Sequence, residues 1–339
     1  MNWITNEDTI IFDPKFNEEL DIELLLNYKK LIFSNYELNE NLFENYLNND
    51  FIGLKYIGNK FNQDVSKLPP NITHLIIGDY FNQDISVLPH SITNLTLGFE
   101  FNNNVSVLPQ NLTHLIFGTW FNQDVSNLPP TLTNLTFGEY FNQDVSKLPR
   151  GITHLIFGIE FNQDVSNLPQ GITHLTFGQK FNQDLSNLPR DLSFLAFCFA
   201  DKFNKDMSNL PQGITHLILG NALKKQCAIP PNIQYLKLNC NEQCMIDNLP
   251  NSLIELKIGH TFNLQMDNLP TSLKKLAFDA YCTYDKDLNC LPDFVEELQL
   301  NASYKKQILH IPSNLKKIIC HENYPYIDDF AMRDVELYS

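Results

Sequence analysis

The amino-acid sequence predicts a mainly β solenoid, in which short coils of chain stack on one another in parallel register. Two observations carry this prediction. A phrase of twenty residues, FNQDVSKLPPNITHLIIGDY at 61–80, returns along the chain with little change. Apolar residues also recur at fixed positions in each unit, with the alternation of a short strand. Since stacked repeats bury a continuous core in one direction, the 339 residues need no second core.

A Phe-Asn pair marks the start of each unit. It falls at 61 and then at every twentieth residue to 181, with a further copy at 203 after a two-residue insertion. Like residues in a parallel stack lie about 4.8 Å apart, close to the separation of stacked rings. The pair is therefore predicted to form a structural ladder, with the Phe rings stacked and the Asn side chains hydrogen-bonded to neighbouring turns. Its members are Phe61, Asn62, Phe81, Asn82, Phe101, Asn102, Phe121, Asn122, Phe141, Asn142, Phe161, Asn162, Phe181, Asn182, Phe203 and Asn204.

The second half of each unit predicts a strand. In the first clear unit Ile72, Leu75 and Ile77 have the L-x-x-L-x-L spacing of a leucine-rich repeat. The central residue recurs thirteen times from Leu75 to Ile318, and three earlier residues fit the same frame, which gives up to sixteen strands. These three are Ile10, Leu31 and Leu54.

The rest of each coil is short. About fourteen residues must turn, cross the back and return, which is too few for a full helix with its two loops. The recurring Leu-Pro step fits such a path, because Pro fixes φ and lacks an amide donor. The expected fold is a leucine-rich-repeat-like solenoid with one long parallel sheet on the concave face and extended or 3₁₀ segments on the convex face.

The regularity of the units divides the chain into four segments. Residues 1–50 are predicted to form an N-terminal cap with degenerate repeats, and residues 51–220 to hold the regular repeats. Residues 221–320 are expected to hold divergent repeats, and residues 321–339 a C-terminal cap or tail. Caps are expected because a parallel sheet leaves an unpaired edge at each end.

Charge and composition exclude several classes of partner. The net charge is −15 and there is no basic stripe, which argues against binding to nucleic acid or an anionic membrane. The N-terminal MNWITNEDTIIF has neither a basic segment nor a long apolar run, so no signal peptide or membrane anchor is expected. The seven cysteines favour free thiols in a reducing compartment, and we expect an intracellular protein.

Outward-facing strand residues are the candidates for binding a protein partner. Up to residue 158 they are nearly uncharged, which fits a docking surface; the alternative is that small neutral residues merely suit tight strand stacking. From 221 onward they become diverse and charged, which fits either a partner site or neutral drift. The candidates on the predicted concave face are His74, Ile76, Asn94, Thr96, His114, Ile116, Asn134, Thr136, His154, Ile156, His174, Thr176, His216, Ile218, Tyr235, Lys237, Glu255, Lys257 and Lys275.

Two further columns are interpreted as structural. No carboxylate or cysteine joins the strand histidines, so exposed strand residues are favoured over a metal site. The Asp column, Asp64 to Asp184, lacks the glycines of calcium-binding β-helices, so turn-forming hydrogen bonds are favoured over cation binding. There is no P-loop, G-x-S-x-G or H-E-x-x-H motif. We expect no enzyme activity, no metal and no cofactor.

The repeated FN…LP…L..L.FG pattern resembles the FNIP repeat family, a short leucine-rich-repeat variant associated with social amoebae and giant DNA viruses of amoebae. The resemblance covers roughly residues 51–320. Several members place an F-box before the repeats, which implies substrate recruitment to a ubiquitin ligase and ligase components as partners. Residues 1–50 show no Leu-Pro-x-Glu-like opening of an F-box. For a viral source, the resemblance implies the host cytoplasm.

Three functions follow as hypotheses. The favoured one is a non-enzymatic protein–protein interaction module that binds an unidentified protein through the concave face and the divergent repeats. The alternatives are a substrate adaptor for a ubiquitin ligase and a passive structural or scaffold protein.

Overall fold

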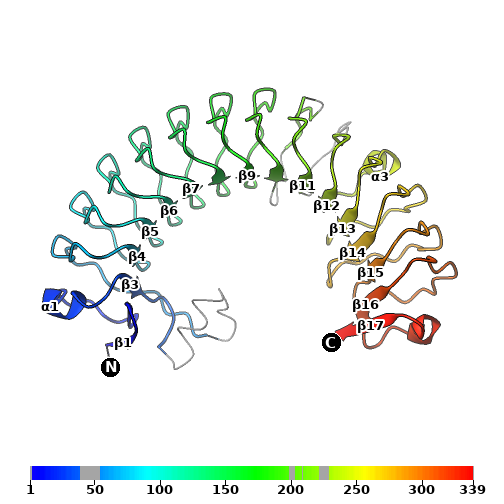
Figure 1. The fold of residues 1–339 in the computed structure, drawn as a ribbon, viewed down its shortest axis with the longest axis horizontal. Helices are drawn as coiled ribbons and strands as arrows, with labels where there is room; N and C mark the ends of the chain where they lie inside the picture. Colours follow the sequence, from blue (N-terminus) through cyan, green and yellow to red (C-terminus); the bar gives the residue numbers. More distant parts are fainter. Residues whose placement is uncertain (1, 39–53, 198–202, 208, 221–228, 339) are drawn as a thin grey trace. The chain divides into compact units, whose positions relative to one another are not determined.

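The structure is a computed structural model that describes residues 2–38, 54–197, 203–207, 209–220 and 229–338. The chain forms two compact units, Met1–Ile172 and Thr173–Ser339. Within each unit successive coils lie side by side, with the strands along one side and the returning loops along the other (Figure 1). The expected leucine-rich-repeat-like solenoid is confirmed.

The first unit begins with a hairpin and continues as a parallel stack. Strand β1 pairs antiparallel with β2, and the strands from β2 to β8 then pair in parallel and in chain order. The elements are β1 (Trp3–Asn6), β2 (Thr9–Phe12), α1 (Ile22–Leu25), β3 (Lys30–Phe33), β4 (His74–Ile76), β5 (Asn94–Thr96), β6 (His114–Ile116), β7 (Asn134–Thr136) and β8 (His154–Ile156). Strand β1 covers the outer edge of β2.

The second unit is parallel throughout. Its strands pair in chain order from β9 to β17. The elements are β9 (His174–Phe177), β10 (Phe194–Phe197), β11 (His216–Leu219), β12 (Tyr235–Leu238), α3 (Gln243–Asp247), β13 (Glu255–Ile258), β14 (Lys275–Phe278), β15 (Glu297–Gln299), β16 (Lys317–His321), the 3₁₀ helix η1 (Ile327–Phe330) and β17 (Asp334–Tyr338). The C-terminal tail therefore folds onto the last repeat as a further strand.

The regular coils are closed by single turns, of which several coils have three. In one coil the amides of Leu88, Ile92 and Phe101 donate to the carbonyl oxygens three residues earlier, at 3.2, 3.2 and 3.3 Å. These are isolated i to i+3 bonds of the 3₁₀ kind, and they do not extend into a helix. The prediction of extended and 3₁₀ structure on the return path is confirmed for these coils.

Stacked phenylalanine rings fill the core, as predicted. Phe81 and Phe101 have ring centroids 6.3 Å apart, and Phe101 and Phe121 have centroids 6.2 Å apart, with planes within 13°. All three side chains are fully buried. These separations exceed the roughly 4.8 Å between adjacent strands.

A second aromatic column explains the wider spacing. Phe117, Phe137 and Phe157 lie closer to the strands than the Phe-Asn column, with centroids 5.6 and 5.5 Å apart. The separation thus grows from the strands towards the loops, so the coils splay apart on the loop side. Each unit consequently bends with its strands on the inner side.

The predicted asparagine ladder is also confirmed. The amide of Asn102 donates to Asn82 Oδ1 at 3.0 Å, and that of Asn122 donates to Asn102 Oδ1 at 2.9 Å. In the second unit Asn204 donates to Asn182 Oδ1 at 3.1 Å. Each side chain therefore satisfies a backbone donor of the next coil, where no sheet partner is available.

One predicted strand is wrong. Strand β3 pairs directly with β4, Leu31 opposite Leu75, so Leu54 does not occupy a place in the sheet. The asparagine ladder likewise passes directly from Asn17 to Asn62, whose backbone amide donates to Asn17 Oδ1 at 3.0 Å. Residues 39–53 lie outside the described residues.

Two further features of the described residues are the state of the cysteines and the length of the helices. Of the described cysteines, Cys244, Cys282, Cys290 and Cys320 are free thiols, and Cys240 Sγ contacts Met245 Sδ at 3.8 Å. Cys198 and Cys227 lie outside the described residues. No helix in the described parts of the chain is both long and apolar enough to cross a membrane.

Candidate functional site

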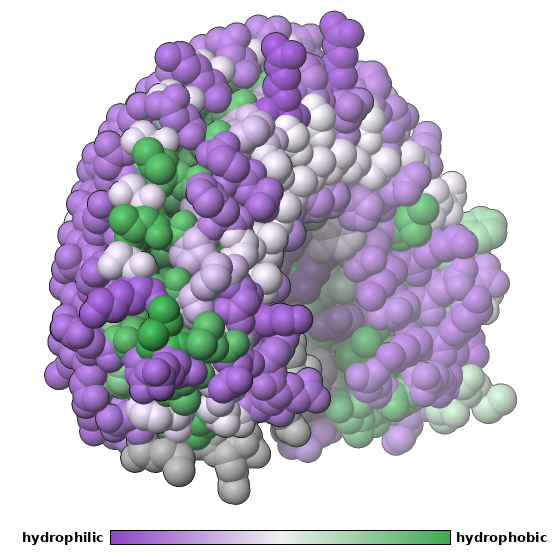
Figure 2. Space-filling view, turned by 60° about the vertical axis from the view of Figure 1, so that its left-hand side comes forward, coloured by the Kyte–Doolittle hydropathy of each residue, from purple (hydrophilic) through white to green (hydrophobic). Residues whose placement is uncertain are grey.

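The outward residues of β4–β8 form what we call the neutral strand face. The structure places each predicted residue beside a buried central leucine, with its own side chain half-buried or exposed. Ile116 and Ile156 are the most exposed aliphatic members, at 44% and 43%. In Figure 2, where the first unit comes forward, exposed hydrophobic residues form separate patches bordered by hydrophilic side chains. The members are His74, Ile76, Asn94, Thr96, His114, Ile116, Asn134, Thr136, His154 and Ile156.

A threonine before each strand orients the first outward residue. Thr113 Oγ1 lies 2.9 Å from His114 Nδ1, and it also donates to the carbonyl oxygen of Thr93 at 3.1 Å. Thr133 makes the equivalent contact to Asn134 Oδ1 at 2.9 Å. The His and Asn side chains are thus held at one end. Burial lowers the pKa of His74, with a further lowering from the nearby Lys30.

Glycines border this face at the end of each strand. A Cβ added to Gly118 would lie 1.8 Å from the carbonyl oxygen of Gly98, and a Cβ at Gly98 would lie 2.0 Å from that of Gly78. The glycines therefore permit a close approach between coils. Tight strand stacking was the alternative that the sequence analysis left open for the small neutral residues.

The predicted residues of β12–β14 form the charged strand face: Tyr235, Lys237, Glu255, Lys257 and Lys275. Their charges pair across strands. Lys275 Nζ lies 3.0 Å from Glu297 and 3.7 Å from Glu255.

Asp279 organises the other two lysines of this face. Its carboxylate lies 2.9 Å from Lys237 Nζ and 3.1 Å from Lys257 Nζ. Burial raises the pKa of Asp279, but the hydrogen bonds and charges of the two lysines outweigh it and hold the pKa below its usual range. The sequence signal for this pairing was the near twenty-residue spacing, which sets Glu255 opposite Lys275 in the register.

The remaining predicted residues lie on β9 and β11. His174 and Thr176 face outward on β9, as His216 and Ile218 do on β11. An aromatic column that sequence reasoning missed joins these strands, because Phe194 lies between the two histidines with centroids 5.5 and 6.4 Å away.

The aspartate column forms turns, as predicted. Asp84 Oδ1 accepts the Ser86 amide at 2.9 Å, and Asp84 Oδ2 accepts the Ser86 hydroxyl at 2.8 Å. These hydrogen bonds lower the pKa of Asp84. Within the described residues, no group of three or more His, Cys, Asp or Glu side chains is placed to hold a metal ion.

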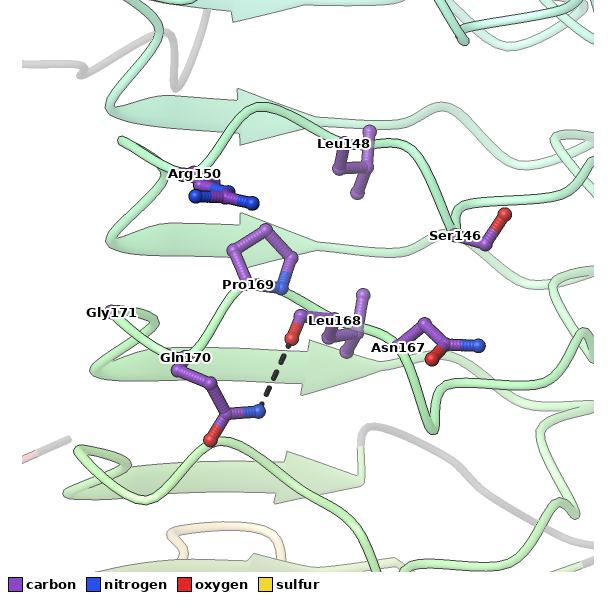
Figure 3. A pocket seen from close by; sticks show the side chains of 8 residues that line it. All are labelled: Ser146, Leu148, Arg150, Asn167, Leu168, Pro169, Gln170 and Gly171. Atoms are coloured by element: carbon purple, nitrogen blue, oxygen red, sulfur yellow. Dashed lines mark hydrogen bonds between the residues drawn. The ribbon is translucent and has the colours of Figure 1, made fainter.

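A shallow pocket lies on the loop side of the first unit (Figure 3). It has a volume of about 590 Å³ and lies between two Leu-Pro turns. Gln170 Nε2 donates to the Leu168 carbonyl oxygen at 3.4 Å along one wall, and Arg150 comes from the preceding coil. Its eight lining residues are Ser146, Leu148, Arg150, Asn167, Leu168, Pro169, Gln170 and Gly171. The hydroxyl of Ser146 donates to Asp144 Oδ2 at 2.8 Å, as part of the aspartate turn of its own coil.

Sequence reasoning also missed a row of exposed aromatic side chains after strands β4–β7, which we call the aromatic edge: Tyr80, Phe99, Trp120 and Tyr140. They are 45%, 42%, 45% and 41% exposed, respectively. Trp120 and Tyr140 stack with centroids 4.3 Å apart and planes within 1°, and Phe99 packs at 79° to Trp120. The row was missed because Phe99 stands one position earlier in its repeat than the other three residues do.

Comparisons with solved structures agree with this architecture. CroV588, described as a circular leucine-rich-repeat protein and coming from the giant virus CroV, is similar with a TM-score of 0.62 and 28% identity. The match covers 96% of this chain and 58% of that protein, so the chain spans little more than half of its length.

Two bacterial structures are similar at a lower level. The internalin InlF of Listeria monocytogenes has a TM-score of 0.47 and 18% identity, over 82% of this chain and 83% of that one. YopM of Yersinia enterocolitica has a TM-score of 0.38 and 17% identity, over 80% and 75%. No curated protein matches the chain.

The family model described as "FNIP Repeat" matches the chain in six segments. These are residues 56–100, 101–140, 124–158, 161–199, 221–261 and 284–323. They cover more than half of the sequence and coincide with the stacked coils that the structure describes. The chain belongs to the FNIP repeat family.

Proposed function

We propose that the protein is a non-enzymatic recognition module that binds another protein through its neutral strand face. One observation carries the proposal: five successive strands present outward side chains without a lysine, arginine or carboxylate, in a chain of net charge −15. A neutral surface can be desolvated against a partner at low cost. The backbone groups of β4–β8 are already paired within the sheet.

The proposal extends to the charged strand face, which supplies selectivity. Its lysines and carboxylates neutralise one another, so a partner must match an alternating pattern. Such a pattern disfavours wrong partners more than it raises affinity. The fold of leucine-rich-repeat proteins, which is typical of protein–protein interaction modules, supports this function in general terms.

The test replaces both exposed isoleucines of the neutral face. Ile116→Glu with Ile156→Glu should abolish capture of the partner from an amoebal lysate, because two charges would be desolvated. Val107→Glu is the matched control, since Val107 is 56% exposed but lies on the loop side of the same unit. Unchanged capture by the double variant, with its circular dichroism intact, would refute binding at this face.

Two other functions are distinguished by the same capture experiment. A ubiquitin-ligase subunit among the captured proteins would favour the adaptor that the family resemblance implies. Self-association without any other saturable partner would favour a passive scaffold.

The proposal places the protein inside a cell and, for a viral source, in the host cytoplasm. The free thiols of Cys244, Cys282, Cys290 and Cys320 support a reducing compartment. Because some of these thiols are buried, protein recovered from cells is denatured without reductant before an alkylating reagent is added. All of its cysteines should then react, and oxidised cysteines would contradict the location.

A further inference from the structure

We propose that the aromatic edge binds an extended peptide segment that carries arginine at alternate positions. This surface lies beyond the carboxyl ends of the strands, so it is distinct from the neutral strand face. The two surfaces are tested with different variants, and failure of one leaves the other standing.

The aromatic edge is a fixed row with one aromatic residue on each coil. Backbone bonds between coils hold it: the Trp120 amide donates to the Phe99 carbonyl oxygen at 3.0 Å, and the Tyr140 amide donates to that of Thr119 at 3.0 Å. The side chains also pack on one another, as the Trp120–Tyr140 stack shows. A rigid aromatic row loses little conformational entropy when a ligand binds.

Carboxylates adjoin three of these rings along the chain, and one of them, Asp79, accepts a hydrogen bond from the Tyr56 hydroxyl. Asp79, Glu100 and Glu139 are direct chain neighbours of Tyr80, Phe99 and Tyr140, and all three side chains are half-buried or exposed. Between residues 79 and 160 the sequence holds seven carboxylates but only two cations, Lys147 and Arg150. Both cations belong to a Leu-Pro turn, and Arg150 lines the loop-side pocket.

This chemistry selects a cationic partner. A guanidinium group binds both aromatic rings and carboxylates, by cation–π attraction and by charge-assisted hydrogen bonds. An anionic partner such as a nucleic acid would be repelled by the same carboxylates. Arginine is favoured over lysine because its planar group stacks on rings.

The spacing of the coils favours an extended chain. Ring centroids along the aromatic edge are 6.1 Å apart from Phe99 to Trp120 and 4.3 Å apart from Trp120 to Tyr140. The coils that carry them, measured at the buried Phe-Asn column, repeat every 6.0 to 6.3 Å along the first unit. Side chains on one side of an extended peptide repeat every 6.6–6.8 Å or so, twice the rise of a strand residue. Alternate arginines can therefore meet successive coils over the four coils of the aromatic edge.

The test uses synthetic ten-residue peptides of alternating Arg and Ser, with Gln–Ser and Glu–Ser peptides as controls. The protein carries Trp3→Phe, which leaves Trp120 as its one tryptophan and makes its fluorescence a direct probe. Only the arginine peptide should produce a saturable change, and its affinity should fall as salt is raised.

Variants separate recognition from general charge attraction. Measured by calorimetry, Trp120→Leu and Glu139→Gln should each weaken binding of the arginine peptide about threefold to tenfold, the size of one cation–π or ionic contact. Val107→Gln, on the loop side, should leave the affinity within a factor of two. Equal affinity of the parent and Glu139→Gln proteins would overturn the proposal, as would equal binding of the Gln–Ser peptide.

Discussion

The close approach of neighbouring coils at their glycines makes a sharp prediction about stability. In Gly118→Ala the new Cβ would lie 1.8 Å from the Gly98 carbonyl oxygen and 2.3 Å from its carbonyl carbon. Real Cβ atoms keep at least 3.0 Å from such atoms, so the coils must separate by about 1.2 Å (3.0 − 1.8) at this point. Both obstructing atoms are backbone, which cannot rotate away.

We therefore expect a cost near the upper end of that for overpacked sites, about 3 kcal/mol. Gly171→Ala is the matched control, because its nearest non-local atom, the Arg150 carbonyl oxygen, would be 3.7 Å from the new Cβ. That contact is ordinary, and alanine restricts the unfolded chain, so the control should be unchanged or more stable by about 0.4–1 kcal/mol.

Denaturant unfolding followed by far-ultraviolet circular dichroism measures the difference. Arrays of repeats can unfold in more than one step, so the midpoint and slope are compared between the two variants under identical conditions. Gly118→Ala should shift the midpoint down and Gly171→Ala should not. Equal midpoints would mean that the coils do not meet at the glycines, and the stacking register would be wrong.

Three further predictions concern the asparagine ladder, the aspartate turns and the charged strand face. Asn122→Ala should lower the free energy of unfolding, measured with denaturant, by about 1–3 kcal/mol. The reason is that the backbone amide of Asn142 and the side chain of Gln143 lose their acceptor, Asn122 Oδ1, at 2.9 and 3.0 Å. Asn122→Asp keeps an acceptor and should cost less. Serine hydrogen bonds hold the pKa of Asp124 and its equivalents below the unfolded value of 3.8. Their contribution to the free energy of unfolding is therefore present above about pH 4 and is lost as the pH falls through the folded pKa. In an acid titration, Ser126→Ala should lose less stability between these two pH values than the parent protein does. Lys275→Met leaves Glu255 and Glu297, on the two flanking strands, without the lysine that they share, and it should cost about 1 kcal/mol, a difference that high salt reduces.

The core of the fold could be predicted because its constraints repeat. Each coil must present the same residue to the same residue above and below, so Phe101, Asn102 and Leu115 reveal their roles by recurrence alone. Leu54 failed because apolar spacing alone cannot show which segments pair in the sheet. The absence of Leu54 from the sheet is visible only in the direct pairing of β3 with β4 and in the hydrogen bond that joins Asn62 directly to Asn17.

The candidate site was less predictable, because its contacts run across coils. Glu255 and Lys275 were read as separate exposed charges, although the register sets them side by side. The aromatic edge forms no column in the sequence, since Phe99 stands one position earlier in its repeat than Trp120 does. The contact between Phe99 and Trp120 depends on packing between neighbouring coils, which the order of residues along the chain does not reveal.

This contrast locates where the chain is free to carry function. The stacked Phe and Asn columns and the glycines cannot vary without losing a buried ring, a backbone partner or the close approach of coils. Variation is found at the outward strand positions, at the two residues after each glycine and at exposed positions around the Leu-Pro step. Both proposed surfaces are built from these positions, on coils whose core is nearly invariant. A partner that distinguishes this chain from other FNIP repeat proteins must therefore contact those side chains.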